Sequence, residues 1–224
     1  MKPPLKAVRA IYKDNTDLIV RMQWHRLIAV VRSANADEAY TTACAASDAG
    51  IWFVEITLTI PGALGVIERL ALRNDLYVGA GTVLSKKDGK EVIAAGARFV
   101  VSPTLELDLI PLCHKAGVAC FSGAATPTEI LAAHRIGADL VKIFPADLLG
   151  GPSFIKQMQG PFPEIRFMVS GGVSLANVHE YVQAGVTGIC LGSSYLAGLL
   201  AAKGIAGFGK EIKEFINRVA EAQS

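Results

Sequence analysis

Short apolar segments recur along the chain, and most of them follow a glycine that closes a helix-like stretch. Five such glycines are Gly50, Gly96, Gly117, Gly137 and Gly185. Glycine suits the left-handed backbone conformation in which a helix ends before the chain turns into a strand. The intervals 96–117 and 117–137 are about half as long as the intervals 50–96 and 137–185. We therefore predict one further strand–helix repeat inside each long interval.

Three more apolar segments supply the remaining repeats, at residues 27–32, 76–80 and 166–169. The predicted strands show little polar alternation, as expected for a parallel sheet covered by helices. Eight consecutive repeats in a chain of 224 residues predict the α/β class and a single (β/α)8 TIM barrel. An open, doubly wound parallel sheet is the alternative, but the even spacing favours a closed barrel.

Helix-start signals fall between the predicted strands. Thr126-Pro127-Thr128-Glu129 has the form of a capping box with proline at the first helical position. Residues 15–25 are expected to form a helix that precedes the first strand and caps the lower end of the barrel. We expect the barrel to occupy residues 17–224, and residues 1–16 form an N-terminal extension to which we assign no role.

Composition excludes several classes of partner. Lys and Arg number 22 against 20 Asp and Glu, so neither nucleic acid nor an anionic membrane is implied. Residues 181–202 carry no charge and are long enough to span a membrane, but glycines and serines interrupt them. We predict instead a helix end, a strand at 187–191, a turn and a new helix. The four cysteines are widely spread without a CxxC pair, which favours free thiols in a reducing cytoplasm over disulfides.

Lys142 stands out within the predicted buried strand at residues 138–146. Lysine is rarely buried, because removing its ammonium group from water is costly. One interpretation is a structural ion pair with a buried carboxylate. The other is a nucleophilic amine that attacks a carbonyl group.

The polar residues at the predicted strand ends indicate what surrounds this lysine, because the active sites of such barrels lie at the carboxyl ends of the strands. In strand order these residues are Arg32, Glu55, Thr82 with Gly79 and Gly81, Ser102 with Pro103, Ser122, Lys142, Gly171 with Gly172, and Ser193 with Ser194. The last two sets follow strands 7 and 8, where backbone N–H groups bind phosphate in many barrels. We therefore predict a phosphate site there.

Glu55 and Lys142 are both expected to face the barrel interior. They could simply neutralise each other. A lysine beside a glutamate, an arginine and a phosphate site is also what Schiff-base chemistry on a phosphorylated keto acid requires. The four histidines are scattered without metal-binding spacing, so no metal site is predicted. The glycines at 79 and 81 lack the spacing of a dinucleotide-binding motif.

From about residue 17 to the C-terminus, the sequence resembles the 2-keto-3-deoxy-6-phosphogluconate (KDPG) aldolase family of class I aldolases. The motifs that carry the resemblance are Ile28-Ala29-Val30-Val31-Arg32, Val54-Glu55-Ile56-Thr57-Leu58, Gly79-Ala80-Gly81-Thr82-Val83, Ser102-Pro103, Val141-Lys142-Ile143-Phe144-Pro145-Ala146, Gly160-Pro161-Phe162, Gly171-Gly172-Val173 and Leu191-Gly192-Ser193-Ser194. Each motif alone is weakly specific, but eight in the same order are strongly specific.

The resemblance implies a cytoplasmic, homotrimeric aldolase barrel without a metal or an organic cofactor. It implies that Lys142 forms the Schiff base and that Glu55 shuttles protons. Arg32 and Thr82 would hold the pyruvate carboxylate, and Pro103 and Phe144 would shape the pocket. By the same resemblance Gly171, Gly172, Ser193 and Ser194 would bind the phosphate, and the products would be pyruvate and D-glyceraldehyde 3-phosphate.

One departure from the family pattern leaves the substrate open. Many members place an arginine four residues after the catalytic glutamate, where this chain has Thr59. A hydroxyl does not replace a guanidinium that binds a carboxylate with two hydrogen bonds. The alternatives are 2-keto-3-deoxy-6-phosphogalactonate or 4-hydroxy-2-oxoglutarate as substrate, a phosphate-binding isomerase or decarboxylase, or a non-catalytic barrel that binds sugar phosphates and keeps Lys142 as an ion pair.

Overall fold

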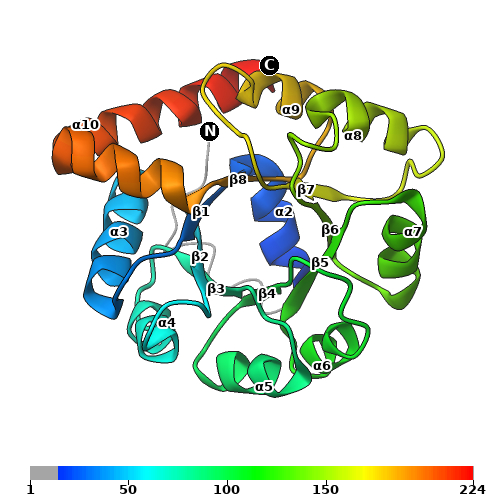
Figure 1. Cartoon of the computed structure of the whole chain (residues 1–224), viewed down its shortest axis with the longest axis horizontal. Coiled ribbons are helices and arrows are strands. Elements are labelled where there is room, and N and C mark those ends of the chain that lie inside the picture. The colour runs from blue at the N-terminus through cyan, green and yellow to red at the C-terminus, as the bar shows by residue number, and fades with distance from the viewer. Residues whose placement is uncertain (1–14, 224) are drawn as a thin grey trace.

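A computed structural model describes residues 15–223, which form a closed barrel of eight parallel strands surrounded by helices (Figure 1). The strands are β1 (Leu27–Val31), β2 (Phe53–Thr57), β3 (Tyr77–Gly81), β4 (Phe99–Val101), β5 (Ala119–Ala124), β6 (Leu140–Ile143), β7 (Phe167–Val169) and β8 (Gly188–Leu191). Each strand pairs with the next, and β8 pairs with β1 to close the ring. The predicted (β/α)8 barrel is therefore confirmed, and the open sheet is excluded.

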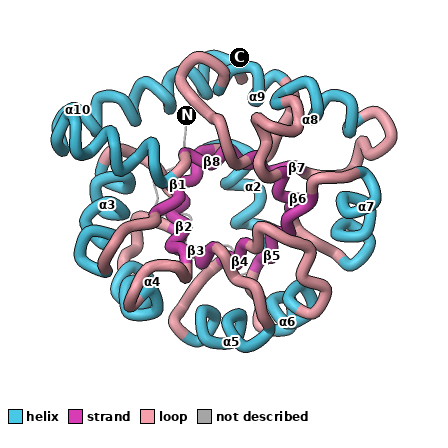
Figure 2. Tube along the Cα trace, viewed as in Figure 1, coloured by secondary structure: helices cyan, strands magenta, loops and turns pink. Residues whose placement is uncertain are grey.

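The outer ring around the strands is formed by the helices α3 (Ala36–Asp48), α4 (Ala63–Ala71), α5 (Lys86–Ala94), α6 (Leu109–Lys115), α7 (Pro127–Ile136), α8 (Gly151–Gln159), α9 (Val178–Gln183) and α10 (Ser193–Ala222) (Figure 2). The helix α2 (Asn15–His25) lies at the centre of this view, inside the outer ring. The capping box predicted at Thr126 is present at the start of α7, with the Thr126 hydroxyl accepting from the Glu129 N–H. The predicted strand and new helix around residues 187–202 are β8 and the first part of α10. Within the described residues, no helix is long and apolar enough to cross a membrane.

Alternation along the strands divides the core into two clusters. Side chains such as Phe53, Phe99, Phe121 and Met168 fill the inside of the barrel, while their neighbours along each strand pack outward against the helices. The inner cluster is tightly filled. A methyl group added at Gly79 would lie 2.3 Å from the Phe99 ring. The interior below the site is therefore a packed floor.

The helix α2 closes the lower end of the barrel, as predicted, and is visible through the centre of the ring in Figure 1. Leu18 and Met22 are buried within the inner cluster. Arg21 forms an ion pair with Asp17 at 2.9 Å. Most of the predicted N-terminal extension, residues 1–14, lies outside the described residues.

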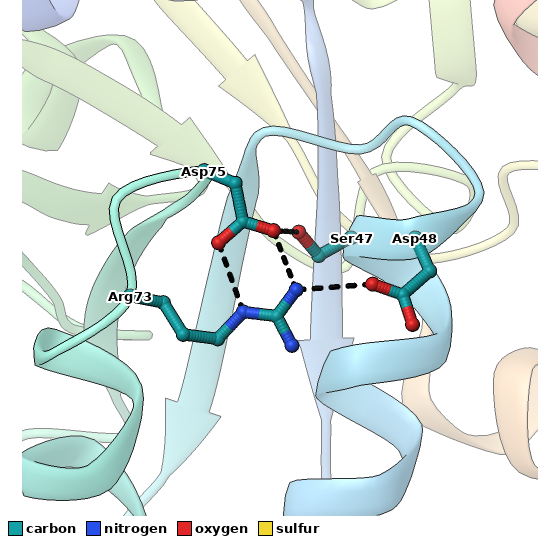
Figure 3. A network of polar contacts seen from close by, with 4 residues as sticks. All are labelled: Ser47, Asp48, Arg73 and Asp75. Carbon is teal, nitrogen blue, oxygen red and sulfur yellow. Dashed lines mark hydrogen bonds and ion pairs between the residues drawn. The ribbon is translucent and has the colours of Figure 1, made fainter. Parts of the chain in front are cut away.

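A polar network fixes the turn between α4 and β3 to the end of α3 (Figure 3). The Arg73 guanidinium donates to both oxygens of Asp75 and to Asp48 at 3.0 Å. The Ser47 hydroxyl donates to Asp75 at 3.1 Å. The hydrogen bonds between Arg73 and Asp75 raise the pKa of Arg73 and lower the pKa of the Asp75 carboxyl. This network lies at the amino end of the strands, opposite the candidate site, so we assign it a structural role.

Candidate active site

Lys142 on β6 and Glu55 on β2 face each other inside the barrel. Their side chains are only 7% and 1% exposed, and Lys142 Nζ lies 3.9 Å from Glu55 Oε1. That separation allows electrostatic attraction but is too long for a hydrogen bond. A buried ion pair that served only stability would be expected to close this gap, because its desolvation cost is repaid only with good geometry.

Glu55 is poised to gain or lose a proton. Burial raises the pKa of its carboxyl group, and the positive charges of Lys142 and Arg32 offset part of that rise. Its Oε2 is buried without a hydrogen-bond partner among the described residues. An unpaired buried oxygen is costly, so this atom is available to a substrate hydroxyl or a water molecule.

Gly81, at the end of β3, makes room for the Glu55 carboxylate. A Cβ atom at this position would lie 1.9 Å from Glu55 Oε1 and 2.5 Å from its Cδ. Backbone strain does not explain the glycine, because Gly81 is absent from the positions with positive φ. Glycine is required at position 81 because the Glu55 side chain occupies the space that a Cβ atom would take.

We predict that Gly81→Ala lowers kcat by about 10²-fold, since a displacement of about 1 Å at a catalytic group has that effect. The added methyl group must push the Glu55 carboxylate away from Lys142. Steady-state kinetics with a melting curve would measure the effect. Gly65→Ala is the matched control, because a Cβ there meets nothing within 4 Å, and it should leave kcat unchanged. Wild-type kcat in Gly81→Ala would contradict this role.

Arg32 and Thr82 lie together, as expected, at the ends of β1 and β3. An Arg32 Nη2 hydrogen bond to Thr82 Oγ1 spans 3.4 Å. Thr82 has a φ of 57°, a left-handed conformation that is unusual for a threonine. Such strained positions occur often at functional sites, where the surrounding structure holds them.

Pro103 and Phe144 flank the lysine. Gly123 pairs with Lys142 across β5 and β6, and a Cβ at Gly123 would lie 2.1 Å from the Pro103 carbonyl carbon. The Ser102-Pro103 turn thus lies directly over the strand next to the lysine. Phe144 was expected inside the strand, but β6 ends at Ile143. Its ring is 41% exposed, with its centre 5.5 Å from Lys142 Nζ.

The two expected phosphate-binding turns differ in form. Gly192 precedes α10, whose first residues are Ser193 and Ser194, so their backbone N–H groups lie at a helix N-terminus. The turn at Gly171 and Gly172 does not start a helix, because α9 begins only at Val178. A helix N-terminus therefore lies at the turn after β8 but not at the turn after β7.

Asp147 lies against the turn at Gly171 and Gly172. A Cβ atom on Gly172 would come within 2.3 Å of the Asp147 Cβ, and Gly172 has a φ of 68°. No role for Asp147 is predictable from the sequence, because its position in the loop after β6 does not reveal which turn it packs against.

Two further inward residues, Cys190 and Thr57, were given no role from the sequence. Cys190 on β8 is fully buried, and burial together with the Glu55 charge raises the pKa of its thiol to about 12. Thr57 on β2 is 1% exposed and hydrogen-bonded to Thr59, with 3.0 Å between their hydroxyl oxygens. Strand alternation would have placed both inward, but alternation does not distinguish a site residue from a core residue.

Together these features define a class of protein. A closed (β/α)8 barrel with a buried lysine and a buried carboxyl group beside it, at the carboxyl ends of its strands, has the groups required by a lysine-dependent, class I aldolase.

Comparison with known proteins identifies the family. The family model described as "Aldolase: KDPG and KHG aldolase" matches residues 18–205. The chain is 36% identical over 172 residues to the 2-dehydro-3-deoxy-phosphogluconate aldolase of Pseudomonas aeruginosa, covering 76% of this chain and 78% of that protein. The chain belongs to the KDPG and KHG aldolase family of class I aldehyde-lyases.

Solved structures of similar proteins have the same fold as this chain. The native KDPGal structure superposes with a TM-score of 0.78 at 30% identity, covering 88% of this chain and 95% of the other. The KDPG aldolase of Legionella pneumophila, captured with pyruvate as a covalent carbinolamine intermediate, gives a TM-score of 0.74 at 27% identity. It covers 92% of this chain and 98% of that one.

Proposed function

We propose that this protein cleaves KDPG to pyruvate and D-glyceraldehyde 3-phosphate through a Schiff base on Lys142. The observation that carries the proposal is the pairing of two buried groups, Lys142 and Glu55, held 3.9 Å apart. The unpartnered Glu55 Oε2 adds to it, since a carboxylate with a free oxygen can take up a proton.

In the first step Glu55 takes a proton from the Lys142 ammonium group, and the amine so formed attacks the C2 carbonyl carbon of the keto acid. A proton then moves from the nitrogen to the oxygen to give the carbinolamine. Glu55 returns a proton to the carbinolamine oxygen, which leaves as water, and a protonated imine remains. Glu55 then accepts the proton of the C4 hydroxyl, the C3–C4 bond breaks, and its electron pair moves into the imine to give an enamine. The aldehyde departs, Glu55 gives the proton from the C4 hydroxyl to C3, and hydrolysis of the imine releases pyruvate and regenerates Lys142.

The rest of the proposed site holds the two ends of the substrate. Arg32 and Thr82 bind the carboxylate beside C2. Ser193, Ser194 and the Gly171-Gly172 turn bind the phosphate, with the N-terminus of α10 supplying N–H groups and a positive helix end. Pro103 and Phe144 form the walls on either side of Lys142.

The substrate is tested by measuring pyruvate release with a coupled assay on four compounds. These are KDPG, its C4 epimer 2-keto-3-deoxy-6-phosphogalactonate, the unphosphorylated form of KDPG, and 4-hydroxy-2-oxoglutarate. We expect the highest kcat/KM with KDPG and a large loss when the phosphate is removed. Equal or faster cleavage of the galactonate epimer, or of 4-hydroxy-2-oxoglutarate, would overturn the choice of KDPG.

A further inference from the structure

Three neighbouring strands end in a row of hydrogen-bond donors. Thr57 pairs with Gly81 across β2 and β3, and Thr82 directly follows Gly81. Arg32 follows Val31, whose partner on β2 is Ile56, the residue before Thr57. Arg32 and Thr57 therefore lie at one level of the barrel with Gly81, and Thr82 lies one residue beyond that level, all on the carboxyl side of Glu55.

The Thr57 hydroxyl in this row is buried and is held by a hydrogen bond to the Thr59 hydroxyl. Thr57 is 1% exposed, and its hydroxyl has Thr59 as its partner at 3.0 Å. A hydroxyl that donates to another hydroxyl leaves the second one with a hydrogen to give. Whichever threonine donates, the pair therefore retains one O–H group that can bind an acceptor.

The Glu55 carboxylate interacts electrostatically with Arg32 but forms no ion pair with it. Within residues 15–223, the Arg32 guanidinium forms no ion pair, and its hydrogen bond goes to the neutral hydroxyl of Thr82. A guanidinium that is not held in an ion pair, together with the three threonine hydroxyls, suits an anion with several acceptor sites. A carboxylate has about four such sites.

We propose that Thr57 and Thr59 complete, with Arg32 and Thr82, the subsite that holds the carboxylate of the keto acid. The inference rests on the proposed function, because it takes the C2 carbonyl to be bound to Lys142. In this arrangement Thr57 donates to the carboxylate and Thr59 orients the Thr57 hydroxyl. Thr57 is a substrate-binding residue, and Thr59 is a positioning residue that acts through it.

The test is borohydride trapping of the imine over a range of pyruvate concentrations. Thr57→Val keeps the branched shape and removes the hydroxyl. It should raise the half-saturating pyruvate concentration about tenfold, the effect of losing one hydrogen bond to a charged group. The maximal amount of trapped protein should not change. Thr57→Ser should restore wild-type binding, and Thr59→Val should raise half-saturation less than Thr57→Val does.

Acetone serves as the second probe, because it has the ketone but lacks the carboxylate. Its trapping should be equal in wild type and Thr57→Val. If Thr57→Val leaves the pyruvate curve unchanged, or shifts the acetone and pyruvate curves equally, the subsite is wrong while the Lys142 imine stands. If wild type traps no pyruvate, the proposed function fails and the subsite with it.

Discussion

Lys142→Met is expected to abolish imine formation and to lower kcat/KM by at least about 10⁴-fold, as loss of a covalent nucleophile does in other enzymes. Methionine fills similar space but has no amine to attack a carbonyl. Lys142→Arg is the matched control for charge, since it keeps a cation beside Glu55 but does not form a Schiff base. Both variants should be inactive in the pyruvate-release assay.

The same variant separates catalysis from a structural ion pair. Removing one partner of a buried pair costs roughly 3–5 kcal/mol when the other charge is left behind. In this barrel burial already raises the pKa of the Glu55 carboxyl, so without Lys142 the group takes up a proton instead of remaining charged. We therefore expect a melting temperature close to wild type. An unfolded or strongly destabilised Lys142→Met protein, rescued by Lys142→Arg, would favour the non-catalytic barrel.

Glu55→Gln is expected to lower kcat by about 10²–10⁴-fold, the usual contribution of a general acid–base group. The amide matches the carboxyl group in size but does not exchange the proton of the C4 hydroxyl. The imine with pyruvate should still form on Lys142, only more slowly. Glu68→Gln on the exposed face of α4 is the control and should retain wild-type kcat. Wild-type kcat in Glu55→Gln would remove Glu55 from the mechanism.

The pH dependence of kcat tests the role of Glu55 independently of the mutations. Glu55 must be ionised to accept the C4 hydroxyl proton, and burial raises the pKa of its carboxyl group. Below that pKa the carboxyl is protonated and cleavage slows, and above it cleavage reaches its plateau. The acidic limb of kcat in wild type should therefore lie above the ordinary glutamate range near ~4.3. That limb should disappear in Glu55→Gln.

The order of the barrel was readable from the sequence because its signals are local. A glycine such as Gly137 closes α7 with a φ of 100°, and the strand that follows is apolar except for Lys142. Five repeats carry this glycine signal, and three further apolar segments supplied the other repeats, so the count gave eight strands. The inward direction of Glu55 and Lys142 followed from alternation within single strands.

Features that depend on the conformation of the loops could not be predicted from such local signals. Phe144 continued the apolar pattern of β6, yet the strand ends one residue earlier and the ring is half-exposed beside the lysine. The Gly171-Gly172 turn has the composition of a helix start but is followed by further turns before α9. Its contact with Asp147 joins two loops that are distant in sequence.

Thr59 shows how the structure sharpens a departure seen in the sequence. Read alone, it is a hydroxyl where the family often has an arginine. In the structure its hydroxyl is the hydrogen-bond partner of the Thr57 hydroxyl. Thr57 in turn lies at one level of the barrel with Arg32. The identity of residue 59 thus matters through the hydroxyl that it orients.

The central claim is that Lys142 forms a covalent imine with the substrate. Incubation with pyruvate, reduction with borohydride and peptide mapping by mass spectrometry test it most directly. The account predicts one reduced pyruvate adduct, located on the peptide that contains Lys142 and absent from Lys142→Met. No adduct in wild type, or an adduct that persists in Lys142→Met, would contradict it.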